Sequence, residues 1–163
     1  MKTETYTLAD LATFTGAGRR TVQLWAEAGA IRADQETERA GTGTHRRFSR
    51  TEAIIACILY AFASKKISIG VLIDIGKALR DILKEKDSRT VIEYAMRTGK
   101  PAYLIFAHVA QGNWAGSLFH PWLQKGENPD VADGMAQAFD SLDEPGSMTF
   151  IIKVNTYLKN MMM

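Results

Sequence analysis

The sequence predicts an α+β fold, in which about four helices and a β-hairpin are followed by a small mixed α/β region. Three observations lead to this expectation. Apolar residues recur at helical spacing in four segments between residues 7 and 84, which is typical of amphipathic helices. A polar, glycine-containing segment at 31–48 interrupts them. Two runs rich in β-branched and aromatic residues, at 102–109 and 148–158, indicate strands in the second half.

Two short helices are expected first. Thr7 and Asp10 have the spacing of a capping box, and Gly16 ends the helix that starts there. The next helix covers residues 19–28 and ends at Gly29. Its apolar residues are Val22, Trp25 and Ala26, and its polar face holds Arg19, Arg20, Gln23 and Glu27. Two short helices joined by a glycine turn form a helix-turn-helix candidate.

Residues 31–48 are expected to form a β-hairpin with a flexible tip, because turn-forming residues separate two short strand-capable ends. The return arm is basic and ends in an aromatic anchor; it consists of His45, Arg46, Arg47 and Phe48. Neighbouring residues of a strand point to opposite faces. The two arginines are therefore expected to point apart, and one of them can pair with an acid such as Glu52.

Two longer helices complete the first half. Ser49 or Thr51 can cap the first of them, whose broad apolar face places the single cysteine, Cys57, in the core. Ser68 can start the second helix, which is expected to reach about Lys84. The basic residues of this second helix are expected to lie mostly outside; they are Lys77, Arg80 and Lys84.

The polar residues 84–87 mark the expected domain boundary, so that 1–86 form one domain and 87–163 form an oligomerisation or effector region. The second region mixes helices with the two strand-forming runs. Its other expected elements are a short helix over 88–97, loops between 112 and 130, and a helix over 131–142.

Composition narrows the class of protein. A single cysteine cannot form an internal disulfide or a thiolate metal site, which excludes disulfide-rich secreted domains and zinc fingers. The apolar stretch 53–63 is too short to cross a bilayer and residues 1–4 lack the apolar segment of a signal peptide, so a cytoplasmic protein without a membrane partner is expected. Residues 1–86 hold 14 basic and 10 acidic residues, whereas 87–163 hold 6 and 8. This asymmetry is compatible with a nucleic-acid-binding first half.

No catalytic or cofactor pattern stands out in the sequence. It has no nucleophile elbow, phosphate loop or paired-carboxylate pattern. His108 and His120 have no acidic residue or cysteine at metal-ligand spacing. We therefore expect neither an enzyme nor a bound metal or cofactor.

The polar face of residues 19–28 has the chemistry of a DNA-reading helix. A helix-turn-helix lays its second helix in the major groove, where arginine can bind guanine and glutamine can bind adenine, although either can also bind phosphates. At most one of the two arginines in the basic arm is expected to face DNA directly. Trp25 and Phe48 fit the core better than a stacking surface. The candidate DNA-binding residues are Arg19, Arg20, Thr21, Gln23, Trp25, His45, Arg46 and Arg47.

Three sequence blocks resemble the signature blocks of the MerR family of transcriptional regulators. They are Tyr6-Thr7-Leu8-Ala9-Asp10-Leu11-Ala12, the segment from Arg20 to Ile31, and Gly43-Thr44-His45-Arg46-Arg47-Phe48-Ser49. The resemblance covers roughly residues 5–85 and implies a winged helix-turn-helix that binds double-stranded DNA. It also implies a recognition helix and a wing whose arginine grips the DNA backbone. The matching residues are Arg20, Gln23 and Trp25 in the helix, and Arg46, Arg47 and Phe48 in the wing.

The chain departs from the family at two places. Leu24 and Trp25 stand where a pair of tyrosines is common, which puts a phenol contact to phosphate in doubt. The helix expected at 88–97 is too short for the long coiled-coil helix of many members.

The leading hypothesis is a sequence-specific transcriptional regulator that binds duplex DNA as a homodimer. One alternative is an excisionase-like architectural DNA-binding protein. Another is a ligand-sensing or protein-interaction module that no longer reads DNA. The aromatic residues between 94 and 122 can line a pocket for a small-molecule effector, or form ordinary core and a dimer interface, and the second interpretation is favoured.

Overall fold

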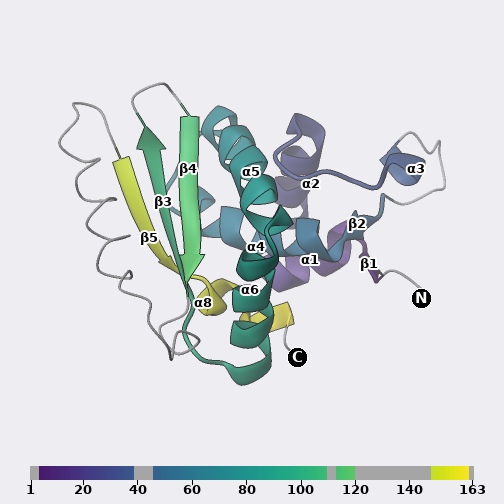
Figure 1. Cartoon of the computed structure of the whole chain (residues 1–163). Helices are drawn as coiled ribbons and strands as arrows, with labels where there is room; N and C mark the ends of the chain where they lie inside the picture. The colour runs from purple at the N-terminus through teal and green to yellow at the C-terminus, as the bar shows by residue number, and fades with distance from the viewer. Residues whose placement is uncertain (1–3, 39–45, 110–112, 120–147, 162–163) are drawn as a thin grey trace, which may run out of the picture. The chain divides into compact units, whose positions relative to one another are not determined.

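The residues that the computed structural model describes are 4–38, 46–109, 113–119 and 148–161. They form a mixed α+β fold, as the sequence predicts (Figure 1). The chain divides into two compact units: the first contains residues up to Arg80 together with 157–161, and the second runs from Asp81 to Thr156. The sequence predicts the boundary after residue 86, six residues later than this division. It also predicts that residues 157–161 belong to the second region, whereas they belong to the first unit.

The division falls within helix α5 (Ile69–Lys84). The elements before it are β1 (Thr5–Tyr6), α1 (Leu8–Thr15), α2 (Arg19–Ala28), α3 (Gln35–Glu38), β2 (Phe48–Ser49) and α4 (Arg50–Ala63). The elements after it are α6 (Lys86–Thr98), β3 (Tyr103–Val109), β4 (Asn113–Phe119), β5 (Met148–Lys153), α8 (Asn155–Leu158) and the 3-10 helix η2 (Lys159–Met161).

The first two helices begin and end as predicted. Thr7 caps α1: its hydroxyl accepts a hydrogen bond from the Asp10 amide at 3.2 Å, and the Asp10 carboxylate accepts one from the Thr7 amide at 2.7 Å. Gly16 and Gly29 end α1 and α2 in the left-handed conformation, with φ of 74° and 83°. A residue with a Cβ is strained at such φ values, so these glycines define the turn between the two helices and the exit from α2.

The prediction of a β-hairpin at 31–48 is wrong for its first arm, the residues that follow Ile31. Residues 31–38 contain no strand, and α3 occupies the end of this segment; the expected tip, 39–45, lies outside the described residues. Strand β2 pairs with β1 in antiparallel fashion, so that Tyr6 lies opposite Phe48. The return arm therefore closes a small sheet with the N-terminal strand.

One backbone hydrogen bond and two bonds of the Thr37 hydroxyl take the place of a strand ladder in the outgoing arm. The Asp34 amide donates to the Arg47 carbonyl at 2.8 Å, and the Arg47 amide donates to the Thr37 hydroxyl at 3.0 Å. The Thr37 hydroxyl also donates to the Asp34 carbonyl at 3.0 Å. Such local bonds compete with a strand ladder. They hold Asp34 and Thr37 against Arg47 and fix the backbone that leads into β2.

Helix α4 forms the centre of the first unit. Ser49 caps it by accepting a hydrogen bond from the Glu52 amide at 3.3 Å, as one of the two expected caps. Every residue from Glu52 to Leu59 is buried, because α1, β1 and β2 all pack against this helix. Cys57 lies in the core as expected, and burial raises the pKa of its thiol to about 12.

The helical pattern of α5 suggested that Arg80 lies on the outside of the protein. The structure shows instead that its side chain is largely buried. Its Nε and Nη2 atoms donate to the two carboxylate oxygens of Glu52 at 2.6 and 3.0 Å, and the two side chains are only 12% and 11% exposed. The expectation that Glu52 pairs with an arginine of the basic arm is therefore wrong as well. A carboxylate buried on α4 needs a cation at close range, and α5 supplies it.

The same ion pair also binds backbone groups that follow α2. Arg80 donates to the Ala30 carbonyl at 2.9 Å, and Glu52 accepts a hydrogen bond from the Arg32 amide at 2.8 Å. These contacts connect α4, α5 and the segment that leaves α2. The position of α2 in the first unit thus depends on a buried charge pair as well as on apolar packing.

Helix α5 passes the same segment very closely at Gly76. A Cβ built at this buried glycine would collide with the backbone carbonyl of Ala30. Gly70, near the start of the same helix, is exposed, and a Cβ there would meet no atom within 4 Å. Gly76 is therefore required for close approach, whereas Gly70 is not.

The C-terminal residues 157–161 belong to the first unit. Helix η2 packs against α1, and the Asn160 amide group donates to the carbonyls of Phe14 at 3.0 Å and Thr13 at 3.4 Å. The last carbonyls of a helix have no intrahelical donors. Asn160 therefore satisfies the C-terminal end of α1.

The second unit is built on an antiparallel sheet of three strands in the order β4-β3-β5 (Figure 1). Strand β4 corrects the expectation that residues from 112 onward are loop. Gly116, which suggested a turn, lies opposite Phe106, and a Cβ there would collide with the Phe106 ring and the Ile105 carbonyl. The expected strand at 102–109 is present as β3 and the expected helix before it as α6, whereas the run 148–158 is a strand only over β5 and ends in the helix α8. The helix expected over 131–142 lies outside the described residues.

Aromatic side chains of this sheet pack on one another. The Trp114 ring stacks on Phe106 with centroids 5.3 Å apart and planes at 14°. Trp114 also lies 5.1 Å from the ring of His108 and 6.0 Å from that of Phe150. Phe106 is fully buried. These four rings are therefore part of the packing of the sheet.

Removal of Arg80 is expected to destabilise the first unit strongly. Arg80→Ala leaves the Glu52 carboxylate buried without its cation, so the free energy of unfolding should fall by about 3 kcal/mol, measured by urea titration. Lys77→Ala is the control, because it removes a cation from the same helix whose partner Asp74 is 52% exposed. That change should cost less than about 1 kcal/mol. Equal losses in the two variants would contradict the structural role of Arg80.

Substitution of Gly76 tests the close approach of α5. Alanine normally stabilises a helix relative to glycine by up to about 1 kcal/mol. Gly76→Ala should instead destabilise the protein by roughly 1–3 kcal/mol, since the new methyl group collides with backbone. Gly70→Ala should leave the thermal midpoint unchanged or raise it. A higher midpoint for Gly76→Ala would mean that α5 does not approach Ala30 so closely.

Candidate nucleic-acid interface

Helix α2 has one buried and one exposed face. Val22 and Trp25 are 0% and 3% exposed and form the inward face. The predicted contact residues Arg19, Arg20 and Thr21 are exposed at the start of the helix. Trp25 is removed from the set of DNA-contacting residues, because its position on the inward face places the indole in the core.

The basic arm contributes two arginines on the approach to β2. Arg46 is half-buried and Arg47 is exposed. Neither belongs to a strand, so the expected alternation along a strand does not apply to them. Phe48 is fully buried, as the core interpretation requires. His45 lies outside the described residues.

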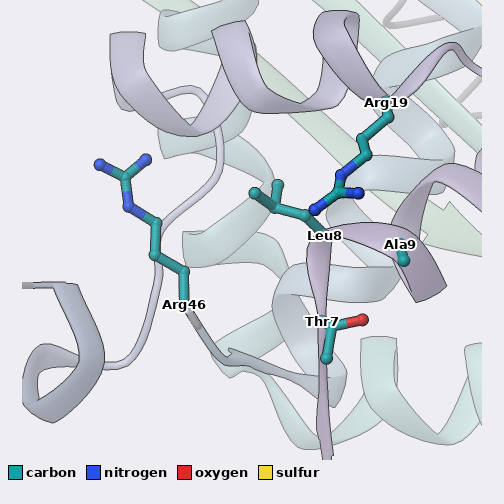
Figure 2. A pocket seen from close by; sticks show the side chains of 5 residues that line it. All are labelled: Thr7, Leu8, Ala9, Arg19 and Arg46. Atoms are coloured by element: carbon teal, nitrogen blue, oxygen red, sulfur yellow. The ribbon is translucent and has the colours of Figure 1, made fainter. Parts of the chain in front are cut away.

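A pocket of about 200 Å³ brings together residues from three segments of the first unit (Figure 2). The start of α1 provides Thr7, Leu8 and Ala9, the start of α2 provides Arg19, and the basic arm provides Arg46. Figure 2 shows the Arg19 side chain reaching from α2 toward Leu8, while Arg46 rises on the other side of Leu8. Two of the predicted DNA-binding residues thus meet at one concave surface.

The two arginines of the pocket are available for an external anion. Within the described parts of the chain, neither Arg19 nor Arg46 forms an ion pair; the ion pairs found there involve Lys77, Arg80 and Lys84. A guanidinium carries several donors in a planar fork that matches phosphate oxygens. The pocket therefore has the charge and the donors to hold a phosphate group.

The start of α1 lines the pocket, and a helix start carries amides without intrahelical acceptors. The first amides of a helix have no intrahelical acceptors, and the helix dipole makes this end favourable for negative charge. In α1 the capping box uses the amides of Thr7 and Asp10, which leaves those of Leu8 and Ala9. The Asp10 carboxylate accepts two hydrogen bonds from Thr7, at 2.7 and 2.8 Å, which hold it on the cap.

Tyr6 supports the pocket from the small sheet. Its ring packs edge-on against Phe14 of α1, with centroids 5.2 Å apart and planes at 82°. Burial, together with a hydrogen bond to Glu4 and the charge of that residue, raises the pKa of the Tyr6 phenol to about 12. A tyrosine phenol is neutral at neutral pH with or without this rise, so the shift leaves the charge beside the pocket unchanged.

Gln23 and Glu27 form a hydrogen-bonded pair on the outer side of α2. The Gln23 Nε2 atom donates to Glu27 Oε1 at 2.7 Å. Gln23 is half-buried, whereas Glu27 is exposed. Between them lies Leu24, whose side chain is 45% exposed. The outer face of α2 thus combines a cation at Arg20, a fixed amide, an acid and an apolar side chain.

Sequence reasoning identified both arginines of the pocket but not its other wall. Thr7 was assigned to helix capping, Leu8 and Ala9 were named only within the first of the three sequence blocks, and none of the three was predicted to bind DNA. The position of Thr7 as a cap was itself a signal, because a capped helix start also exposes amide donors. Arg46 reaches this helix start only through the pairing of β1 with β2, which the sequence pattern did not indicate.

Comparison with known protein families finds no match for this chain, and comparison with curated proteins finds none either. Function must therefore be inferred from the residues of this chain. In the part of the chain that the structure describes, no helix has the length and apolar character needed to cross a membrane.

Proposed function

We propose that this protein is a DNA-binding transcriptional regulator of the MerR type, in which the first unit acts as a winged helix-turn-helix. The observation that carries the proposal is the pocket in which Arg19 and Arg46 meet the start of α1. In this proposal the pocket holds one phosphate of the DNA backbone, and α2 enters the adjacent major groove.

The position of the pocket relative to α2 supports this assignment. Arg19 belongs to the pocket and is also the first residue of α2, so a phosphate held there would lie beside the N-terminal end of the helix. A recognition helix contacts bases mainly through its N-terminal residues. Arg20 and Thr21 are exposed at that end. A phosphate contact at Arg19 would thus set the register in which they meet base edges.

The resemblance of the three sequence blocks to MerR regulators agrees with this arrangement, since the pocket draws one residue or more from the first block and from the third. We propose that the protein acts as a homodimer, so that two copies of α2 enter successive major grooves of an inverted repeat. The second unit would supply dimerisation, with a small-molecule effector as a further proposed partner. The protein would act in the cytoplasm.

Loss of the pocket arginines is expected to weaken DNA binding in a salt-dependent way. The Arg19→Ala/Arg46→Ala double variant should bind any duplex on the order of tenfold more weakly at low salt. Its plot of log Kd against log salt should be less steep by about one unit, because one phosphate contact is lost. Fluorescence anisotropy with a labelled duplex over a salt series measures both quantities.

The matched control is the Lys77→Ala/Lys84→Ala double variant, which removes the same formal charge from α5, where each lysine pairs with an exposed aspartate. It should retain the affinity and the salt dependence of the parent protein. An equal change in the two double variants would assign the effect to net charge and count against the pocket. Absence of salt-dependent duplex binding by the parent protein would overturn the proposed function.

A further inference from the structure

The acid on the exposed side of α2 requires an explanation. Glu27 lies seven residues after Arg20, so the two side chains project in nearly the same direction, away from the buried Val22 and Trp25. If this side faces DNA, a carboxylate there opposes binding to a polyanion in general. Its carboxylate accepts a hydrogen bond from the Gln23 amide at 2.7 Å, one helical turn away.

The hydrogen bond to Glu27 fixes the orientation of the Gln23 amide. A carboxylate only accepts hydrogen bonds, so the NH₂ group of Gln23 must point toward Glu27. The second N–H and the carbonyl oxygen remain for another partner. A glutamine without such a neighbour can turn its amide over and present donor and acceptor in either order. Here the hydrogen bond to Glu27 favours one order before any partner binds.

This arrangement of donor and acceptor matches one base. Adenine presents in the major groove an acceptor at N7 beside a donor at N6, which a glutamine amide binds with its N–H and its carbonyl. Guanine presents two acceptors, N7 and O6, so the amide carbonyl would face the guanine O6 without a proton between them. An amide whose orientation is fixed therefore discriminates against guanine more strongly than a freely turning one.

We propose that Gln23 reads an adenine in each half-site of the DNA target and that Glu27 is its positioning residue. This inference rests on the proposed function, because it requires α2 to lie in the major groove. The inference adds to the proposed function a preference for adenine, which it assigns to the Gln23 side chain. It also assigns a role in sequence specificity to Glu27, the only acid on the polar face of α2.

The test is a selection of bound duplexes from a random library, run with the full chain as the parent protein and as three variants. The parent protein should enrich a motif with adenine at one position of each half-site. Gln23→Ala should lose about tenfold in the preference for adenine over guanine at that position and keep the rest of the motif. Glu27→Ala should weaken the same preference severalfold while binding duplexes at least as tightly overall.

Glu27→Gln supplies a rescue that a merely structural role would not give. Its side-chain carbonyl can still accept the hydrogen bond from Gln23, so most of the adenine preference should return. Melting temperatures of the three variants should match that of the parent protein, because both side chains lie on the outer side of α2. A melting temperature that falls in Glu27→Ala in parallel with the loss of preference would assign Glu27 to helix stability and overturn its positioning role.

A duplex with a single altered atom tests the contact directly. In 7-deazaadenine a carbon replaces N7 while the N6 amino group remains. The parent protein should bind the altered duplex several-fold more weakly, and Gln23→Ala should bind the altered and normal duplexes equally. Equal binding by the parent protein would overturn the reading of adenine by Gln23.

The remaining outcomes separate this inference from the function on which it rests. If the parent protein enriches a motif but Gln23→Ala enriches the same one unchanged, Gln23 reads no base and only the inference fails. If Glu27→Ala loses a preference for cytosine at another position, Glu27 contacts DNA itself and its positioning role fails. If the parent protein binds no duplex at any salt concentration, the proposed function fails together with the inference.

Discussion

The buried ion pair between Glu52 and Arg80 holds together the parts of the first unit that the proposed interface requires. Glu52 belongs to the central helix α4, and Arg80 reaches it from α5 with two hydrogen bonds. Both side chains then bind backbone groups at Ala30 and Arg32, just beyond the end of α2. Apolar packing is tolerant of small sliding movements, but a two-pronged charge contact is geometrically specific. The exit from α2 is therefore held at a defined place on the core.

The parts of the fold that could be predicted are those specified by neighbouring residues. The cap at Thr7 depends on Asp10, the end of α2 depends on Gly29, and the start of α4 depends on Ser49, so each signal lies within one helical turn. The ion pair joins residues 28 positions apart, and Tyr6 pairs with Phe48 although α1, α2 and α3 lie between them in the chain. Contacts of such sequence separation leave no local pattern. Strand β4 was missed for a different reason, because Gly116 is read as a turn residue when its neighbour in space, Phe106, is unknown.

The candidate site also has features that could be predicted from local sequence and features that could not. The arginines could be named from the sequence, since their position on a polar helix face or in a basic segment is local information. Their meeting at the start of α1 could not, because it follows from strand pairing and loop closure. Trp25 was named both as a contact residue, from its match to the motif, and as a core residue, from its apolar position on the helix, and its exposure of 3% agrees with the core interpretation.

The hydrogen bonds from Asn160 to the end of α1 affect how this protein is synthesised. Because residues 157–161 belong to the first unit, that unit is discontinuous along the chain, with the whole second unit inserted into it. A ribosome releases the N-terminal helices long before it releases Asn160. The first unit therefore stays incomplete during translation, with Thr13 and Phe14 uncapped, until the second unit has been made. Competence for binding would then be gained only after residues 157–161 have been made, and a fragment that stops at residue 86 would lack part of its own helix cap.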